Sequence, residues 1–149
     1  MEAWPFSEEE WQAVGDAALP VVNAHFARDE VLRASCFLTL LETLDDLRTR
    51  HGDHPILFET EADFTDEDEE RLPLYGRAIA AAEAHEMQTL TIRISLAEAL
   101  LRLSRPAEAR AELLACRDEM QESEDESDRR SWSDLMAECE RLLGPAPPE

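Results

Sequence analysis

Nearly every segment of this chain carries apolar residues at the three- and four-residue spacing of an α-helix, and this pattern limits the fold more than any other feature. No segment shows the two-residue alternation of a half-buried strand convincingly. The spacing predicts seven helices, over about residues 8–28, 29–51, 55–64, 66–85, 88–103, 105–120 and 129–143. We therefore expect an all-α protein.

Polar residues at the expected helix starts support this division. Ser7 and Glu10 have the spacing of a capping box, and Phe6 and Trp11 are placed to form the hydrophobic staple around it. Asp29 is the expected cap of the second helix. These residues predict two well-defined helix starts in the first thirty residues.

Later helix starts are predicted from the same kinds of residue. Asp66 with Glu69 repeats the capping signature, and Ser104 precedes a proline suited to a first helical turn. Pro20 and Pro73 are expected to bend or shorten their helices. The wide apolar face of 29–51 predicts a helix buried on two sides. The stretch 121–128 is expected to be an acidic loop.

A weak internal repeat lies beneath the helices. At an offset of 38 residues, apolar positions fall on apolar positions. The matched pairs include Phe37 with Tyr75, Tyr75 with Leu113, Ala78 with Cys116, Phe58 with Leu96, and Ala62 with Leu100. Such recurrence predicts three helix pairs followed by a final helix that seals the open end of a stack.

The segment SLAEALLRLSRPAEARAELLAC (95–116) resembles a tetratricopeptide repeat, and LYGRAIAAAE (74–83) resembles the second helix of such a repeat. The resemblance implies stacked antiparallel helix hairpins, about three tetratricopeptide-like pairs, with a C-terminal capping helix in a right-handed α-solenoid. The expected single domain, 1–149, divides into an N-terminal helix pair (1–52), two repeats (53–87 and 88–122), the capping helix (128–143) and a tail (144–149).

The resemblance also implies a protein- or peptide-binding concave surface built from the first helix of each pair. In the clearest repeat the matching residues are Thr91, Ile94, Glu98, Leu101 and Arg102. Family members that clamp a terminal carboxylate use lysines and an asparagine there. This chain has no lysine, so carboxylate clamping is not expected.

Charge excludes several function classes. Asp and Glu number 35 against 14 arginines, which gives a net charge of −21. Such a surface repels nucleic-acid phosphates and anionic membranes, so neither is an expected partner. Without lysine, a P-loop and Schiff-base chemistry are impossible. The N-terminus lacks the pattern of a signal peptide. The three cysteines are interpreted as reduced thiols of the core, so we expect a cytoplasmic protein.

The densest chemical feature is the segment ETEADFTDEDEE (59–70), with eight acids among twelve residues. One interpretation is a solvated helix corner whose acids favour the start of the following helix. Others are a docking site for a basic protein or a site for a divalent cation; the segment lacks the glycine of a calcium loop. The residues singled out for docking are Glu59, Asp63, Asp66 and Glu67.

No catalytic residue, cofactor or metal site is predicted. His51 and His54 flank Asp53 but lack the spacing of a ligand pair on one helix, and imidazoles at a helix end commonly bond free carbonyls. No serine or cysteine has an activating context. We therefore expect a protein that is not an enzyme.

The sequence favours a monomeric interaction scaffold or adaptor whose acidic and apolar groove binds a basic protein or peptide segment. The alternative is an immunity-type or nucleic-acid-mimic inhibitor of a basic toxin or nuclease. A carboxylate-lined metalloenzyme would need inward-facing Glu and His, and the predicted inner faces are apolar instead. Strong self-repulsion favours the monomer.

Overall fold

The computed structural model describes residues 4–145, and within that range it contains eight α-helices and no strand. The all-α prediction is confirmed. The helices are α1 (Glu8–Phe26), α2 (Glu30–His51), α3 (Pro55–Phe64), α4 (Asp68–Ala84), α5 (Leu90–Arg102), α6 (Pro106–Ala115), α7 (Arg117–Glu122) and α8 (Glu126–Leu143).

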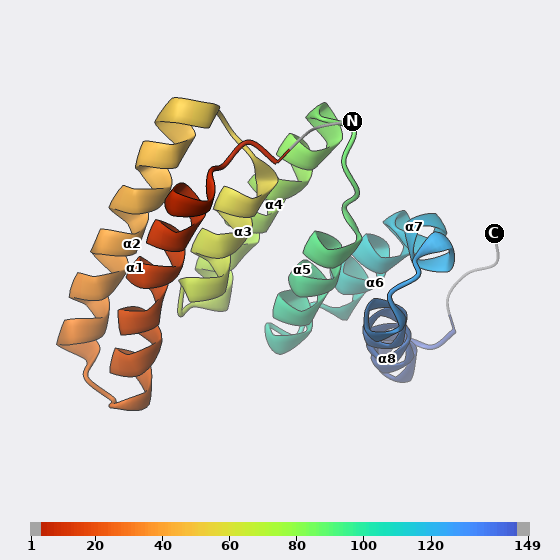
Figure 1. Ribbon diagram of the computed structural model, residues 1–149. Helices are drawn as coiled ribbons and strands as arrows, with labels where there is room; N and C mark the ends of the chain where they lie inside the picture. The colour runs from red at the N-terminus through yellow and green to blue at the C-terminus, as the bar shows by residue number, and fades with distance from the viewer. Residues whose placement is uncertain (1–3, 146–149) are drawn as a thin grey trace.

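The helices follow chain order across the molecule, from α1 and α2 at one end to α7 and α8 at the other (Figure 1). The largest contacts join α1 with α2, α3 with α4, α5 with α6 and α4 with α5, while α8 packs on both α5 and α6. Most of the packing is therefore between elements close in sequence.

Two apolar clusters form the interior. One lies mainly between α1, α2 and α3 and includes Val21, Leu40, Leu44 and Leu57. The other extends from α3 to α8. It contains both members of four pairs matched by the 38-residue offset: Tyr75 with Leu113, Ala78 with Cys116, Phe58 with Leu96, and Ala62 with Leu100. Because adjacent residues of α3 point to different clusters, this short helix joins the two ends of the molecule.

The first helix start is formed as predicted. The Ser7 side chain accepts from the Glu10 N–H at 3.0 Å, and Glu10 accepts from the Ser7 N–H at 2.9 Å. Phe6 and Trp11 stack beside it with ring centroids 5.6 Å apart. Asp29 caps α2 through the Leu32 N–H, also as predicted. These contacts define where α1 and α2 begin.

Two other predicted caps are wrong. The N-cap of α4 is Glu67 and that of α6 is Arg105, and neither cap side chain bonds the helix. Asp66 instead forms an ion pair with Arg33 of α2, with a nitrogen-to-oxygen distance of 2.8 Å. Ser104 adopts a positive φ of 59° in the turn that closes α5. Tertiary ion pairing and turn geometry override the local capping signal at these sites.

Helix α2 is not buried on two sides, contrary to the prediction. Leu40, Leu44 and Leu47 are buried, whereas Val31 is 84% exposed and Leu38 is 60% exposed. The reason is position: α2 lies at one end of the molecule, with its main contacts on α1 and α3. Neither proline ends its helix, because Pro20 lies inside α1 and Pro73 inside α4.

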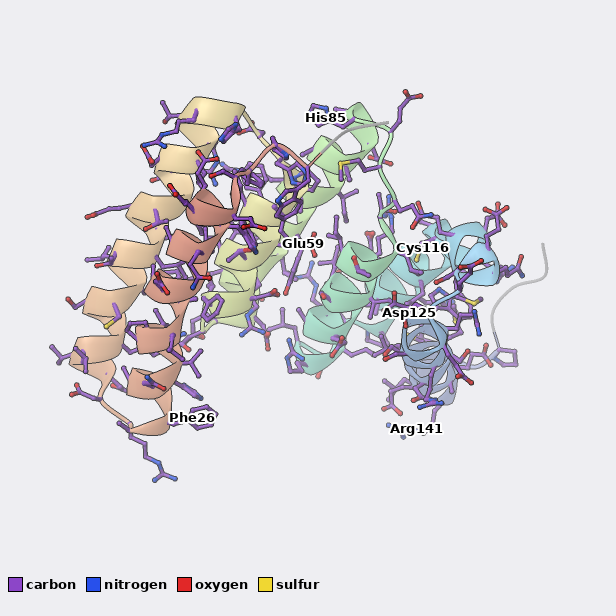
Figure 2. All side chains as sticks on the ribbon, viewed as in Figure 1. Phe26, Glu59, His85, Cys116, Asp125 and Arg141 are labelled. Atoms are coloured by element: carbon purple, nitrogen blue, oxygen red, sulfur yellow. The ribbon has the colours of Figure 1, made fainter. Side chains whose placement is uncertain are left out.

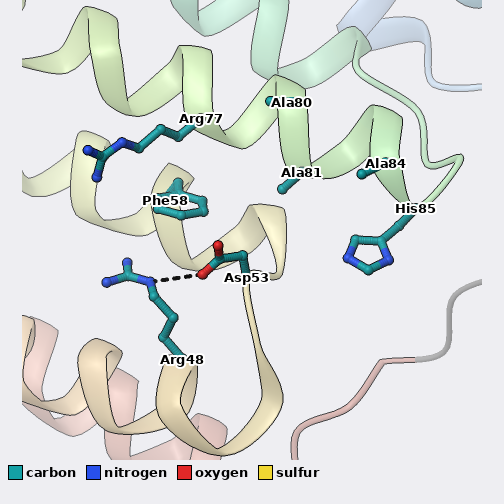
Figure 3. A pocket seen from close by; sticks show the side chains of 8 residues that line it. All are labelled: Arg48, Asp53, Phe58, Arg77, Ala80, Ala81, Ala84 and His85. Carbon is teal, nitrogen blue, oxygen red and sulfur yellow. Dashed lines mark ion pairs between the residues drawn. The ribbon is translucent and has the colours of Figure 1, made fainter.

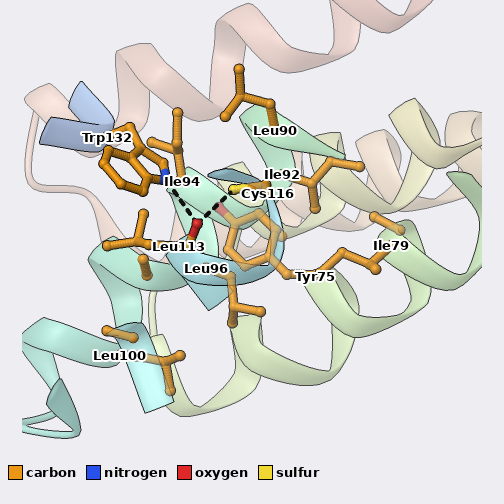
Figure 4. Packing of buried hydrophobic residues seen from close by; sticks show 14 of the residues in the cluster. Tyr75, Ile79, Leu90, Ile92, Ile94, Leu96, Leu100, Leu113, Cys116 and Trp132 are labelled. Atoms are coloured by element: carbon orange, nitrogen blue, oxygen red, sulfur yellow. Dashed lines mark hydrogen bonds between the residues drawn. The ribbon is translucent and has the colours of Figure 1, made fainter. Parts of the chain in front are cut away.

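The predicted helix 105–120 is divided at Cys116. The Leu113 carbonyl accepts from the Trp132 indole N–H at 2.8 Å and from the Cys116 thiol at 3.5 Å (Figure 4). It also accepts from the Cys116 backbone N–H at 3.3 Å. In a continuous helix that carbonyl would accept from the N–H of Arg117. A side chain from α8 thus bonds this carbonyl at the point where the chain leaves α6 and enters the separate helix α7.

The expected acidic loop 121–128 is mostly helical. Only 123–125 lie between α7 and α8, and Asp125 caps α8 by accepting from the Asp128 N–H at 3.1 Å. Acids in a first helical turn interact favourably with the helix dipole, so α8 begins earlier than predicted. Of the expected tail 144–149, residues 146–149 lie outside the described range. No helix of the described residues combines the length and apolarity that crossing a membrane requires.

Candidate functional site

Glu59 and Asp63 lie one turn apart on α3 and therefore share a face of that helix. Glu59 is partly buried and Asp63 is exposed. The neighbouring Phe58 and Ala62 point into the apolar interior. Figure 2 shows Glu59 near the middle of the molecule, on the helix that joins the two apolar clusters.

Tyr75 of α4 connects this face to α5. Its ring is buried, and its hydroxyl donates to Asp63 Oδ1 at 2.9 Å. The side chain of Ser95 on α5 lies close enough to this hydroxyl to influence its pKa. Tyr75 thus binds a carboxylate of α3 and lies near a hydroxyl of α5.

The exposed side of α5 extends this surface. Thr91, Ser95, Glu98 and Arg102 follow one another at helical spacing, and none of them is buried. Arg102 is bound to Asp68 of α4 through two nitrogens, at 3.0 and 3.1 Å. This pairing holds the pKa of Asp68 below its ordinary value. We name the surface formed by Glu59, Asp63, Thr91, Ser95, Glu98 and Arg102 the acidic face.

Two of the predicted partner-binding residues are not presented on this face. Ile94 is only 6% exposed and belongs to the core cluster, so its side chain is not presented to a partner. Leu101 is partly buried against the same cluster. Both lie on the side of α5 that turns toward other helices, and burial of apolar surface accounts for their position.

Asp66 and Glu67 are exposed and lie beyond the end of α3, where the chain turns into α4. Asp66 is paired with Arg33, and Glu67 is the N-cap residue of α4. The acidic segment therefore divides at the end of α3. Its first half contributes to the acidic face, and its second half lies at the corner between α3 and α4.

Two carboxyl groups of α3, those of Glu59 and Asp63, have raised pKa values. Burial raises the pKa of Glu59 from 4.5 to about 7, and the charge of Asp63 adds to this rise. No cation among the described residues offsets it. Desolvation also raises the pKa of Asp63, although the Tyr75 hydroxyl and the Arg71 charge act in the opposite direction. Glu59 is thus a carboxylate whose charge the folded chain itself does not neutralise.

A pH-dependent stability effect follows for Glu59→Gln. A raised acid pKa means that the folded state binds the proton more tightly, so the charged form destabilises the fold above pH 7, and this penalty fades toward pH 4.5. We expect the substitution to increase the free energy of unfolding at pH 8 by about 1–3 kcal/mol, and much less at pH 5. Urea denaturation at both pH values measures the difference. The control Glu42→Gln, on exposed α2 surface, should show no such dependence.

A separate pocket of about 470 Å³ lies beside Arg48 and Phe58, with Arg77, His85 and three alanines of α4 on its wall (Figure 3). The Arg48 guanidinium lies 4.7 Å from the centre of the Phe58 ring. Asp45 at 2.7 Å and Asp53 at 3.6 Å already neutralise this arginine. Arg48 therefore serves mainly to connect α2 with α3.

His51 and His54 both have partners among the described residues. His51 Nε2 contacts Glu10 at 2.9 Å, and His54 Nδ1 accepts from the Ile56 N–H at 3.2 Å as the cap of α3. No group of three or more His, Cys, Asp or Glu with metal-site geometry occurs in residues 4–145. Cys116 and Cys139 are buried free thiols, and Cys36 is partly buried.

The acidic face presents carboxylates and hydroxyls, which accept hydrogen bonds from guanidinium and ammonium groups. Comparison with protein-family models, with curated proteins and with solved structures found no match to this chain. Its function is therefore inferred from the residues of this face. Sequence reasoning missed Ser95 and the hydrogen bond of Tyr75 with Asp63. The helical spacing from Thr91 to Glu98 was a signal that could have identified Ser95.

Proposed function

We propose that this protein is a non-enzymatic interaction scaffold that binds a basic protein or peptide segment on the acidic face. The proposal includes a tetratricopeptide-like, right-handed solenoid of three stacked antiparallel hairpins, closed by α8. The contacts of α1 with α2, α3 with α4 and α5 with α6 support this architecture. The shared burial of residues matched at the 38-residue offset supports it too.

The observation that carries the functional proposal is the uncompensated charge of Glu59. Burying a carboxylate without a partner is unfavourable, and within the described residues no cation offsets its desolvation. Arg102, the cation of the acidic face, is committed to Asp68. An arginine or lysine from a partner would supply the missing charge, and the net charge of −21 would steer it toward this protein.

The alternative, a nucleic-acid mimic that inhibits a basic toxin or nuclease, requires acids ordered like phosphates along one surface. The acids of 59–70 are instead divided between the acidic face and the α3–α4 corner, where Asp66 is neutralised by Arg33. This division favours the scaffold. Cytoplasmic location and a monomeric state remain part of the proposal, the latter because a charge of −21 opposes self-association.

Calorimetric titration with a synthetic peptide of alternating arginine and serine tests the proposal. We expect Glu59→Gln to weaken binding about tenfold, equivalent to about 1.4 kcal/mol. The substitution removes the carboxylate with which the partner's cation forms an ion pair. Binding by the unaltered protein should weaken as salt is added. A peptide of alternating glutamate and serine should not bind.

The matched control is Glu42→Gln, which makes the same change in net charge on exposed α2 surface. Its affinity for the arginine peptide should stay within about twofold of the unaltered protein. If Glu42→Gln weakens binding as much as Glu59→Gln, the attraction is a general property of the charged surface and the acidic face is not the site.

A further inference from the structure

A second pocket adjoins the acidic face at Asp63. It lies between α1 and the α3–α4 corner and has a volume of about 230 Å³. Its apolar wall includes Val22 and Phe26 of α1 and Phe64 of α3, and Asp63 stands on its rim side by side with these residues. The pocket and the acidic face therefore share a carboxylate.

The apolar wall is open to solvent. Phe26, at the end of α1, is 79% exposed, and Leu19, two turns earlier on the same side, is 59% exposed. Behind this wall, Val21 is buried in the N-terminal apolar cluster and Phe64 packs against that cluster. Exposed apolar surface beside buried, packed apolar residues is typical of an interaction site.

The two arginines that line the pocket already bind other groups of this chain. Arg33 is bound to Asp66 at 2.8 Å and to the Phe64 carbonyl at 2.7 Å. Arg71 donates to the Thr65 carbonyl at 2.6 Å and pairs with Asp68 at 3.5 Å. His25 also lines the pocket. Asp63 accepts a hydrogen bond from the neutral Tyr75 hydroxyl and is influenced by the charge of Arg71, but it forms no ion pair with a described residue, so it can attract a further positive charge.

The volume of the pocket limits the size of the group that it can hold. Sites for whole small molecules measure about 300–1,000 Å³, so a pocket of about 230 Å³ suits a single side chain. We infer that this pocket receives one large apolar side chain, such as leucine, of the same basic segment that the acidic face binds. Because Asp63 belongs to both surfaces, the apolar residue and the cation of the partner lie close together. The inference rests on the proposed function.

Two probe peptides test the inference: the alternating arginine–serine peptide, and the same peptide with its central serine replaced by leucine. The measured quantity is the ratio of their dissociation constants. We expect the unaltered protein to prefer the leucine peptide about tenfold, since burying a leucine side chain is favourable and ordering it offsets part of the gain.

Val22→Trp should fill the pocket and bring this ratio close to one. Val31→Trp, the same replacement at an exposed site on α2, is the matched control and should keep the preference. Phe26→Ser removes exposed apolar surface without disturbing a buried residue, and it should lower the preference about threefold. This second variant keeps the inference testable if Val22→Trp does not fold.

The outcomes separate the inference from the proposed function. If the unaltered protein binds neither peptide, the proposed function itself is wrong. If it binds both peptides equally, only the apolar subsite is wrong. A leucine preference that persists in both Val22→Trp and Phe26→Ser places the apolar contact elsewhere and also overturns the inference.

Discussion

Replacing Trp132 with alanine is expected to lower the free energy of unfolding by about 3–5 kcal/mol. The side chain is only 8% exposed and lies in the apolar cluster where α8 packs on α5 and α6. Its indole N–H donates to the Leu113 carbonyl at 2.8 Å (Figure 4). The substitution removes both the packing of a large ring and a buried hydrogen bond.

Trp132→Phe separates these two contributions, because it keeps an aromatic ring and removes the N–H. The lost hydrogen bond should cost about 1 kcal/mol, with a further loss from the smaller ring. Leu142→Ala, at a 48% exposed position of the same helix, is the control and should stay within about 0.5 kcal/mol. Urea denaturation followed by circular dichroism measures all three. A loss for Trp132→Ala no greater than that for Leu142→Ala would contradict the role of α8 as a packed terminal helix.

Leu44→Ala is the second substitution with a large expected effect, about 2–5 kcal/mol. Leu44 has 0% exposure and lies in the N-terminal apolar cluster. If the proposed stack is correct, stability is transmitted mainly between neighbouring repeats. The amides of α1 and α2 should then lose protection from hydrogen exchange more than those of α5 and α6.

Leu113→Ala makes the same replacement in the other cluster, also at a position with 0% exposure. It should produce the opposite pattern, with protection lost first in α5 and α6. The exposed Leu38→Ala should change neither region. If Leu44→Ala and Leu113→Ala lower protection uniformly along the chain, the molecule behaves as one cooperative unit, and the proposed repeat-by-repeat transmission is wrong.

The existence of the helices could be predicted because it depends on local interactions. Apolar spacing reports the 3.6-residue period directly. The capping box of Ser7 and Glu10 requires only residues three apart, and it formed as predicted. The exposed positions Thr91, Glu98 and Arg102 also follow from helical spacing on α5.

Predictions failed where a residue's surroundings come from distant parts of the chain. At the break near Cys116, the Leu113 carbonyl accepts from the indole of Trp132, nineteen residues further along the chain. Asp66 was expected to cap a helix, yet it pairs with Arg33 from another helix. In both cases a tertiary interaction replaces the local one that the sequence pattern suggests.

By itself, the sequence determined that this chain is helical, strongly acidic and without lysine, because these properties follow from composition and short-range spacing. Only the tertiary structure decided that Val31 is exposed and that Glu59 is desolvated with no cation among the described residues to offset it. Periodicity identifies the faces of a helix, but it does not say which face packs against another helix. Solvent exposure and charge compensation depend on that packing.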